Sequence, residues 1–172
     1  MLATLVAMPR VRWLTPAEDE AWRGYRRMRT LLDLQLARDL GQDSELSEPD
    51  YDVLSTLSEG PQPRWRASDL ATHLRWSSSR LAHHVGRMER RGLVAREPCA
   101  DDRRGAMITL TDTGWATLRA AAPPHVESVR RHFIDLLTPA EVAALATISQ
   151  KVIAHLGGHQ PDPAAGSRPA DA

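Results

Sequence analysis

The chain has 172 residues, 42% of them hydrophobic, and its 22 basic residues balance its 22 acidic ones. This composition suits one compact domain, or one small domain with helical extensions, and no apolar run approaches the roughly 20 residues of a membrane-spanning helix. Because the chain has no basic leader with a cleavage site and only one cysteine, Cys99, we expect a cytoplasmic protein without disulfides or membrane contact.

The first predicted helix begins at residue 15. Thr15 can cap it, Pro16 suits the first helical position, and Glu18 can complete a capping box. An apolar stripe then recurs every three or four residues and stops at Gly41; its members are Trp22, Tyr25, Met28, Leu32, Leu36 and Leu40. A helix this long at a chain end needs a surface to bury against, so we interpret residues 15–46 as a dimerisation helix and residues 1–14 as a flexible segment.

The middle of the chain predicts three more helices, two of them forming a helix-turn-helix. Ser47 begins a helix that is broken by the glycine and prolines of residues 60–63, and Ser68 can cap a short third helix. After a tight turn, Ser77 or Ser78 caps a fourth helix, which a glycine ends. Two short helices joined in this way are typical of helix-turn-helix proteins.

Two strands are predicted to follow. Residues 93–96 predict one strand and residues 106–110 a second, with Ala106, Ile108 and Leu110 on one face, and the charged loop 98–105 joins them into a hairpin that forms a wing. We therefore interpret residues 47–110 as a winged helix-turn-helix lobe. The expected fold class is mainly α with a small β-hairpin wing (α+β), a lobe with dimerisation helices at both ends.

Residues 111–156 predict two C-terminal dimerisation helices. A proline pair at 123–124 must kink or interrupt the first of them. Thr138 and Glu141 form a second capping box, which begins the last helix. The tail, residues 157–172, is rich in Gly, Pro, Ala and Asp and is expected to be disordered.

Charge is distributed unevenly along the chain. Between residues 64 and 104 there are ten basic residues (Arg64, Arg66, Arg75, Arg80, Arg87, Arg90, Arg91, Arg96, Arg103 and Arg104) against five acidic ones (Asp69, Glu89, Glu97, Asp101 and Asp102). A local excess of about +5 favours a polyanionic partner.

The fourth helix has one apolar and one polar face. Leu81, Val85 and Met88 share the face expected in the core, and His84 lies toward its flank, where a packing or capping role is expected. The opposite face carries hydrogen-bonding side chains and almost no acid, which favours a DNA-recognition helix over a merely solvated face. The candidate DNA contacts are Ser77, Ser78, Ser79, Arg80, His83 and Arg87.

The hairpin carries the most specific motif. Residues 102–104, Asp-Arg-Arg, precede the sequence Ile-Thr-Leu-Thr at 108–111, and this arrangement resembles the Asp-x-Arg wing signature of the MarR (multiple antibiotic resistance regulator) family. Residues 89–94 resemble that family's recognition-helix exit, and residues 68–71 resemble its third helix. The resemblance covers roughly residues 15–156.

The resemblance implies roles for three wing residues. Arg104 is expected to enter the minor groove, where a narrow groove attracts a guanidinium, with Asp102 orienting it and Arg103 touching phosphate. In the alternative interpretation these charges only pair with one another on a solvated turn.

The resemblance also implies how the protein works. We expect a homodimer that binds a pseudo-palindromic operator in double-stranded DNA and acts as a ligand-responsive repressor. Such an effector would bind in the crevice between the dimerisation helices and the lobe. Six aromatic residues can line a crevice, although aromatic residues at helical spacing are more often core: Trp13, Trp22, Tyr25, Trp65, Trp76 and Trp115.

Other classes of function fit less well. The sequence contains no nucleophile elbow, phosphate-binding glycine loop or paired His motif, so we expect no enzyme, no cofactor and no metal. Cys99 as an oxidation sensor and a zinc site built from the seven histidines are both disfavoured by their sequence context. The remaining alternative is a winged helix that serves as a protein-interaction module without sequence-specific DNA binding.

Overall fold

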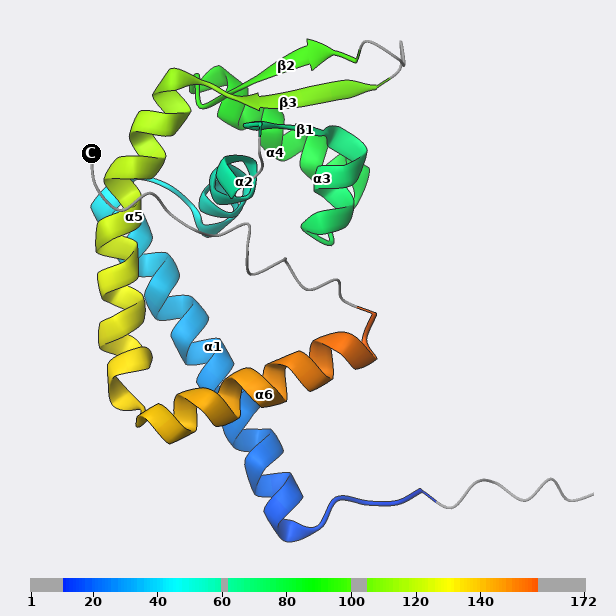
Figure 1. Cartoon of the computed structure of the whole chain (residues 1–172), viewed down its shortest axis with the longest axis vertical. Helices are drawn as coiled ribbons and strands as arrows, with labels where there is room; N and C mark the ends of the chain where they lie inside the picture. Colours follow the sequence, from blue (N-terminus) through cyan, green and yellow to red (C-terminus); the bar gives the residue numbers. More distant parts are fainter. Residues whose placement is uncertain (1–10, 60–61, 100–104, 158–172) are drawn as a thin grey trace, which may run out of the picture. The chain divides into compact units, whose positions relative to one another are not determined.

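The structure is a computed structural model that describes residues 11–59, 62–99 and 105–157. By its internal contacts the chain divides into two units, Met1–Leu34 and Gln35–Ala172, with the division inside the first helix. Figure 1 labels the α-helices and strands, which are α1 (Pro16–Ser44), α2 (Glu48–Glu59), β1 (Arg64–Arg66), α3 (Ala67–His73), α4 (Ser78–Arg90), β2 (Val94–Pro98), β3 (Ala106–Leu110), α5 (Asp112–His132) and α6 (Pro139–His155). A short 3-10 helix (Ile134–Leu136) lies between α5 and α6. The prediction of a mainly helical chain with a β-hairpin is confirmed.

Helix α1 begins at the predicted capping box and continues past the apolar stripe. The amide of Thr15 donates to Glu18 Oε2 (2.7 Å) and the amide of Glu18 donates to Thr15 Oγ1 (3.3 Å), which completes the expected capping box. The apolar stripe stops at Gly41, and the helix itself continues to Ser44. The left-handed position that ends a helix is taken instead by Glu45, at φ 57°.

The sheet of the lobe has one strand more than the predicted hairpin. Its strand order is β1-β3-β2, and both pairings are antiparallel (Figure 1). Trp65 of β1 lies opposite Ile108, and Arg96 of β2 lies opposite the same residue from the other side. The residues around Trp65, expected only as an extended piece, therefore close the free edge of the wing's second strand.

The hydrophobic core lies within the lobe and against α5. Its buried residues come from the end of α1, from α2, α3 and α4, from the sheet and from α5: Leu40, Leu46, Val53, Leu54, Leu57, Leu70, Ala71, Leu81, Val85, Met88, Leu93, Val94, Ile108, Leu110, Leu118 and Ala121. Trp65, Trp76 and Trp115 pack against this cluster, which supports the interpretation of these three as core residues.

The starts of α3 and α4 differ in how they are capped. Ser77 caps α4 by accepting a hydrogen bond from the amide of Arg80, as predicted. The predicted cap of α3 is wrong, because Ser68 lies inside that helix and the N-cap residue, Arg66, makes no side-chain cap. Strand β1 runs directly into α3, so the pairing of β1 with β3 sets the start of the helix.

Helix α5 passes through its proline pair without interruption. It extends over Asp112–His132 with Pro123 and Pro124 inside. A proline removes the hydrogen bond to the carbonyl four residues earlier, and here those carbonyls belong to Arg119 and Ala120, which are both exposed. Water can therefore bind the freed carbonyl groups, so the helix continues.

Helix α6 has a well-defined start and no buried residue. Thr138 accepts a hydrogen bond from the amide of Glu141 while the Glu141 carboxylate accepts one from the amide of Thr138, which confirms the second capping box. Its large apolar side chains remain exposed: Val142, Ile148, Val152 and Ile153. Within the part of the chain that the structure describes, no helix is long and apolar enough to cross a membrane.

Candidate nucleic-acid interface

The turn between α3 and α4 is tight and held by backbone hydrogen bonds. The amide of Trp76 donates to the carbonyl of Ala71 (2.9 Å) and the amide of Arg75 donates to Thr72 (3.1 Å). Arg75 takes a left-handed conformation at φ 56°, a region that costs energy for a residue with a side chain. The turn thus sets the direction in which α4 leaves α3.

Helix α4 has one buried and one exposed face, as its periodicity predicts. Leu81, Val85 and Met88 are buried. The candidate DNA contacts are all exposed: Ser77, Ser78, Ser79, Arg80, His83 and Arg87. The first turn has no acidic residue, and Arg87 and Arg90 lie in the last turn. The exposed face therefore offers free amide groups at one end and cationic side chains along its length, an arrangement that suits phosphate and base edges.

Arg80 is held by an aromatic ring. Its guanidinium lies 4.3 Å from the centre of the Trp76 ring. Trp76 in turn meets the His84 ring edge-on, with ring centres 5.3 Å apart. A cation over an indole face is stabilised by the ring's quadrupole, so Arg80 is partly ordered before any partner binds.

A buried polar cluster lies beneath the exposed face of α4. Asp50 and His84 are only 4% and 5% exposed, and the two side chains approach to 3.0 Å between Asp50 Oδ1 and His84 Nε2. Asp50 Oδ2 accepts hydrogen bonds from the amide (3.0 Å) and hydroxyl (2.8 Å) of Ser47 and from Arg91 Nη1 (2.8 Å). Arg87 Nη2 lies 2.7 Å from His84 Nδ1.

The surroundings shift the titration of both buried groups. Burial alone would raise the pKa of Asp50, but the hydrogen bonds from Ser47 and the guanidinium of Arg91 outweigh it, and the pKa is lowered. Burial lowers the pKa of His84; the carboxylate of Asp50 opposes this shift, and the charge of Arg87 adds to it. At neutral pH the cluster therefore holds an ionised carboxylate and a neutral imidazole.

Gly86 lies on the exposed face of α4, but the side chain of Arg96 from the wing strand β2 lies beside it. Arg96 of β2 donates from Nη2 to the carbonyl of Ala82 (2.6 Å), and its Nε lies 3.6 Å from Glu89 Oε2. A Cβ atom added at Gly86 would lie 3.7 Å from the same Nη2. The wing strand is therefore attached to the middle of α4, an interaction that the helical periodicity alone did not predict.

The hairpin has the register needed for a wing. Val94 pairs with Leu110 and Pro98 pairs with Ala106, and the amide of Cys99 donates to the carbonyl of Gly105 (3.2 Å). Asp102, Arg103 and Arg104 lie outside the described residues, so their roles stay predictions.

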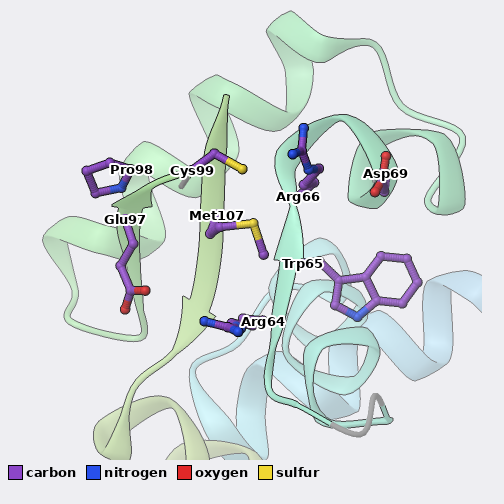
Figure 2. Close-up of a pocket in the computed structure, with 8 residues that line it drawn as sticks. All are labelled: Arg64, Trp65, Arg66, Asp69, Glu97, Pro98, Cys99 and Met107. Carbon is purple, nitrogen blue, oxygen red and sulfur yellow. The ribbon is translucent and has the colours of Figure 1, made fainter. Parts of the chain in front are cut away.

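The outer side of the sheet carries a shallow pocket of about 510 Å³ (Figure 2). Its lining mixes two arginines with two acids and two sulfur-containing side chains: Arg64, Trp65, Arg66, Asp69, Glu97, Pro98, Cys99 and Met107. The balanced charge of this lining does not define a ligand. In the described residues, no three His, Cys, Asp or Glu side chains gather closely enough to hold a metal ion.

A helix-turn-helix followed by a paired hairpin, with a third strand closing the sheet, defines the class of winged helix-turn-helix proteins. The MarR family model matches residues 46–105. AbsC, a MarR family transcriptional regulator from Streptomyces coelicolor, is 46% identical, with 87% of this chain and 100% of that chain covered and a TM-score of 0.81.

Two further relatives extend the comparison. Sco3205, a MarR family transcriptional regulator from the same organism solved in complex with DNA, is 39% identical over 94% of this chain and 97% of its own, with a TM-score of 0.81. PecS, a helix-turn-helix transcriptional regulator from Dickeya dadantii, is 33% identical over 96 residues, and the match spans 55% of each chain. The chain therefore belongs to the MarR family of transcriptional regulators, as its motifs predict, and not to a family of enzymes.

Proposed function

We propose that the chain is a sequence-specific regulator of transcription that binds double-stranded DNA as a homodimer, on a pseudo-palindromic operator, in the cytoplasm. The observation that carries the proposal is the exposed face of α4, which presents Arg80, His83 and Arg87 on a helix whose opposite face is buried. A helix fixed in this way can enter a major groove with its side chains directed at base edges and phosphates.

The N-terminal end of α4 supports a contact with the DNA backbone. Ser78 and Ser79 are exposed in its first turn, where amide groups have no helical partner. An amide or hydroxyl that meets a phosphate fixes the orientation of the helix without selecting bases. We therefore assign positioning to the serines, and base readout to Arg80 and His83 further along the helix.

The terminal helices support the dimer. Trp22, Tyr25 and Leu31 of α1 are about half exposed. Ile148 and Val152 of α6 are exposed to a similar extent. Apolar surface of this extent is stabilised when a second copy covers it. A two-fold axis through these helices would present two copies of α4, about one DNA turn apart, to successive major grooves.

The wing completes the proposal. Arg104 is assigned to the minor groove, Asp102 to orienting it and Arg103 to phosphate. Arg104→Ala should weaken operator binding in a gel-shift at moderate salt while the circular dichroism spectrum stays that of the wild type. Arg131→Ala, at an exposed position of α5, is the matched control for loss of one positive charge. Unchanged affinity of Arg104→Ala would contradict the wing assignment.

Selection of bound sequences from a random DNA pool tests the whole proposal. The expected result is an enriched site made of two inverted half-sites centred about 10 base pairs apart. A salt titration then separates the two classes of function, since a nucleic-acid reader loses affinity steeply with salt. No enrichment and no salt-dependent binding would favour the protein-interaction module.

Regulation by a small molecule is proposed on the resemblance alone. A ligand-responsive repressor would release its operator when the effector binds, and thermal shifts of the purified protein in the presence of aromatic acids and phenols test this. Ligands that raise the melting temperature and also reduce operator affinity would support the proposal. Ligands that stabilise the protein without changing operator affinity would contradict it.

A further inference from the structure

A continuous polar chain runs from the buried start of α2 to the exposed face of α4. Asp50 Oδ1 lies 3.0 Å from His84 Nε2, and on the other side of the same ring Nδ1 lies 2.7 Å from Arg87 Nη2. His84 is buried, whereas Arg87 is exposed. The imidazole therefore connects a fixed carboxylate in the core with a guanidinium on the surface.

The partners determine where the ring proton lies. A guanidinium has donors only, so Nδ1 must offer its lone pair to Arg87 and cannot carry a proton. The proton of the neutral ring is thereby assigned to Nε2, the atom that faces Asp50. The carboxylate of Asp50 favours this tautomer. Hydrogen bonds from Ser47 and Arg91 hold the carboxylate in position.

The charges around the ring favour its neutral form. Asp50 is already compensated by Arg91, and Asp52, whose pKa is raised by burial, faces His125 of α5 as well as His84. Burial and the charge of Arg87 lower the pKa of His84. The charged or titratable groups that face it are Asp50 and Asp52 from α2 and Arg80 and Arg87 from α4, with Arg91 and His125 one contact further away.

We propose that His84, oriented by Asp50, is a positioning residue that holds Arg87 ready for DNA, and that protonation of its ring releases this arginine. The inference rests on the proposed function, because it assigns a contact with DNA to Arg87. An arginine that is ordered before binding loses less side-chain entropy on binding, so the complex is more stable. The advantage disappears when Nδ1 gains a proton, because two donors with like charge then face each other.

The inference predicts that acid weakens the contact made by Arg87. Protonation of His84 adds a charge within the lobe but frees Arg87, so the complex loses the advantage of an ordered arginine. Groups other than His84 are the same in the wild type and in a variant whose residue 84 does not titrate, so the difference between the two proteins isolates the effect of His84.

Two amide substitutions separate the two sides of the ring. In His84→Asn the side-chain oxygen takes the place of Nδ1 and can accept from Arg87, whereas in His84→Gln the amide nitrogen reaches the place of Nε2 and can donate to Asp50. Neither side chain titrates. We expect His84→Asn to bind operator DNA within about twofold of the wild type, and His84→Gln to lose roughly two- to tenfold, the cost of ordering one long side chain on binding.

A double-mutant cycle with Arg87→Ala provides the readout that a purely structural role would not change. If His84 acts through Arg87, His84→Gln should cause no further loss of affinity in the Arg87→Ala protein. The pH profile gives a second readout: because the pKa of His84 is lowered, the wild type should lose affinity relative to His84→Asn only as the pH falls below the usual histidine value of about 6.5. His125→Asn is the matched control, since His125 is a half-buried histidine whose pKa is also lowered by burial but whose ring lies against Tyr51, with ring centres 4.4 Å apart.

The outcomes distinguish failure of the inference from failure of the proposed function. Equal losses for His84→Asn and His84→Gln, or the same loss with and without Arg87, would overturn the inference while DNA binding stands. Failure of the wild type to bind any DNA would instead contradict the proposed function. In that case the 15N shifts of His84 in the free protein still test the positioning: a hydrogen-bonded, unprotonated Nδ1 that changes in Arg87→Ala supports it, and a protonated Nδ1 overturns it.

Discussion

The winged helix-turn-helix lobe and the C-terminal helix α6 differ in how far their apolar side chains are buried. In the lobe, the apolar faces of α2 and α4 are buried, and Val53, Leu54, Leu57, Val85 and Met88 have almost no exposed surface. In α6 no residue is buried, although its composition is the more hydrophobic. An amphipathic or apolar helix thus shows that a partner surface is needed, and only the structure shows whether the same chain supplies it.

The two regions also differ in their polar residues. The lobe buries Asp50 and His84; Ser47 and Arg91 donate hydrogen bonds to Asp50, and Arg87 approaches His84 Nδ1 to 2.7 Å. The helices outside the lobe have a comparable contact, since the buried Ser128 of α5 donates to Asp39 of α1 (2.6 Å). Other ion pairs there, such as Arg23 with Asp19 and Arg131 with Glu127, are exposed and contribute little to stability. The lobe is therefore expected to be the stable part of a single chain, and the terminal helices the part that depends on association.

The largest expected effect is on assembly. Ile148 is 59% exposed on α6, and Ile148→Asp would place a carboxylate in the apolar surface that we propose to be covered by the second copy. Burying that charge without a partner costs several kcal/mol, so the variant should be monomeric at micromolar concentration. Sedimentation equilibrium measures this directly.

A matched control keeps that experiment specific. Gln150→Asp adds the same charge at an exposed polar position of the same helix and should leave the molecular mass in solution unchanged. If Ile148→Asp is a dimer as stable as the wild type, α6 does not form the interface around this position. If both variants are monomeric, charge on α6 and not its apolar surface controls assembly.

The second prediction concerns the core of the lobe. Leu57 is fully buried in α2, and Leu57→Ala should lower the free energy of unfolding by about 2–5 kcal/mol, because it removes buried methyl groups and leaves a cavity. Leu31→Ala, at an exposed site of α1, should change the unfolding of a dilute sample by less than about 0.5 kcal/mol. Urea unfolding at two protein concentrations measures both. Similar losses at the two sites would contradict the division between lobe and terminal helices.

Much of the fold could be predicted because its signals are local. The boxes formed by Thr15 with Glu18 and by Thr138 with Glu141 each join residues three apart, and the helical period placed Val85 and Met88 in the core. The exposed face of α4 followed from the same period. Local rules also failed where tertiary contacts decide: Ser68 is a suitable cap, but the pairing of β1 with β3 makes Arg66 the cap residue.

The polar cluster of the candidate site could be predicted only in part. The sequence placed His84 toward the core flank of α4, and the structure buries it. Its partner Asp50 comes from another helix, and the hydrogen bond between Arg91 and Asp50 joins residues 41 positions apart. Spacing along one helix carries no information about such a pair. Ser47 and Asp50 are nevertheless three positions apart, the spacing of a capping pair.

The third prediction tests whether that cluster stabilises the lobe. Asp50→Asn keeps the shape of the side chain but removes the charge that Arg91 and Ser47 stabilise, so the free energy of unfolding should fall by about 1–3 kcal/mol at neutral pH. Because the folded pKa of Asp50 is lowered, its contribution is complete above the usual aspartate pKa and is lost as the pH falls through the folded value. The difference between wild type and variant should therefore shrink in acid. A difference that is constant from neutral to acid pH would show that ionisation of Asp50 does not stabilise the fold.

The smallest expected effects come from the two helix caps, and they compare the regions most directly. Ser77→Ala and Thr138→Ala each remove a hydroxyl that accepts an amide hydrogen bond at a helix start, a loss of about 1 kcal/mol where the helix is part of the cooperative unit. For Ser77 the loss should appear in urea unfolding at any protein concentration, because α4 packs in the core of the lobe. For Thr138 it should appear only where the dimer is populated, because α6 buries nothing within its own chain. A loss of unfolding free energy for Thr138→Ala that does not depend on protein concentration would mean that contacts within a single chain already stabilise α6. The contrast between the lobe and this terminal helix would then no longer hold.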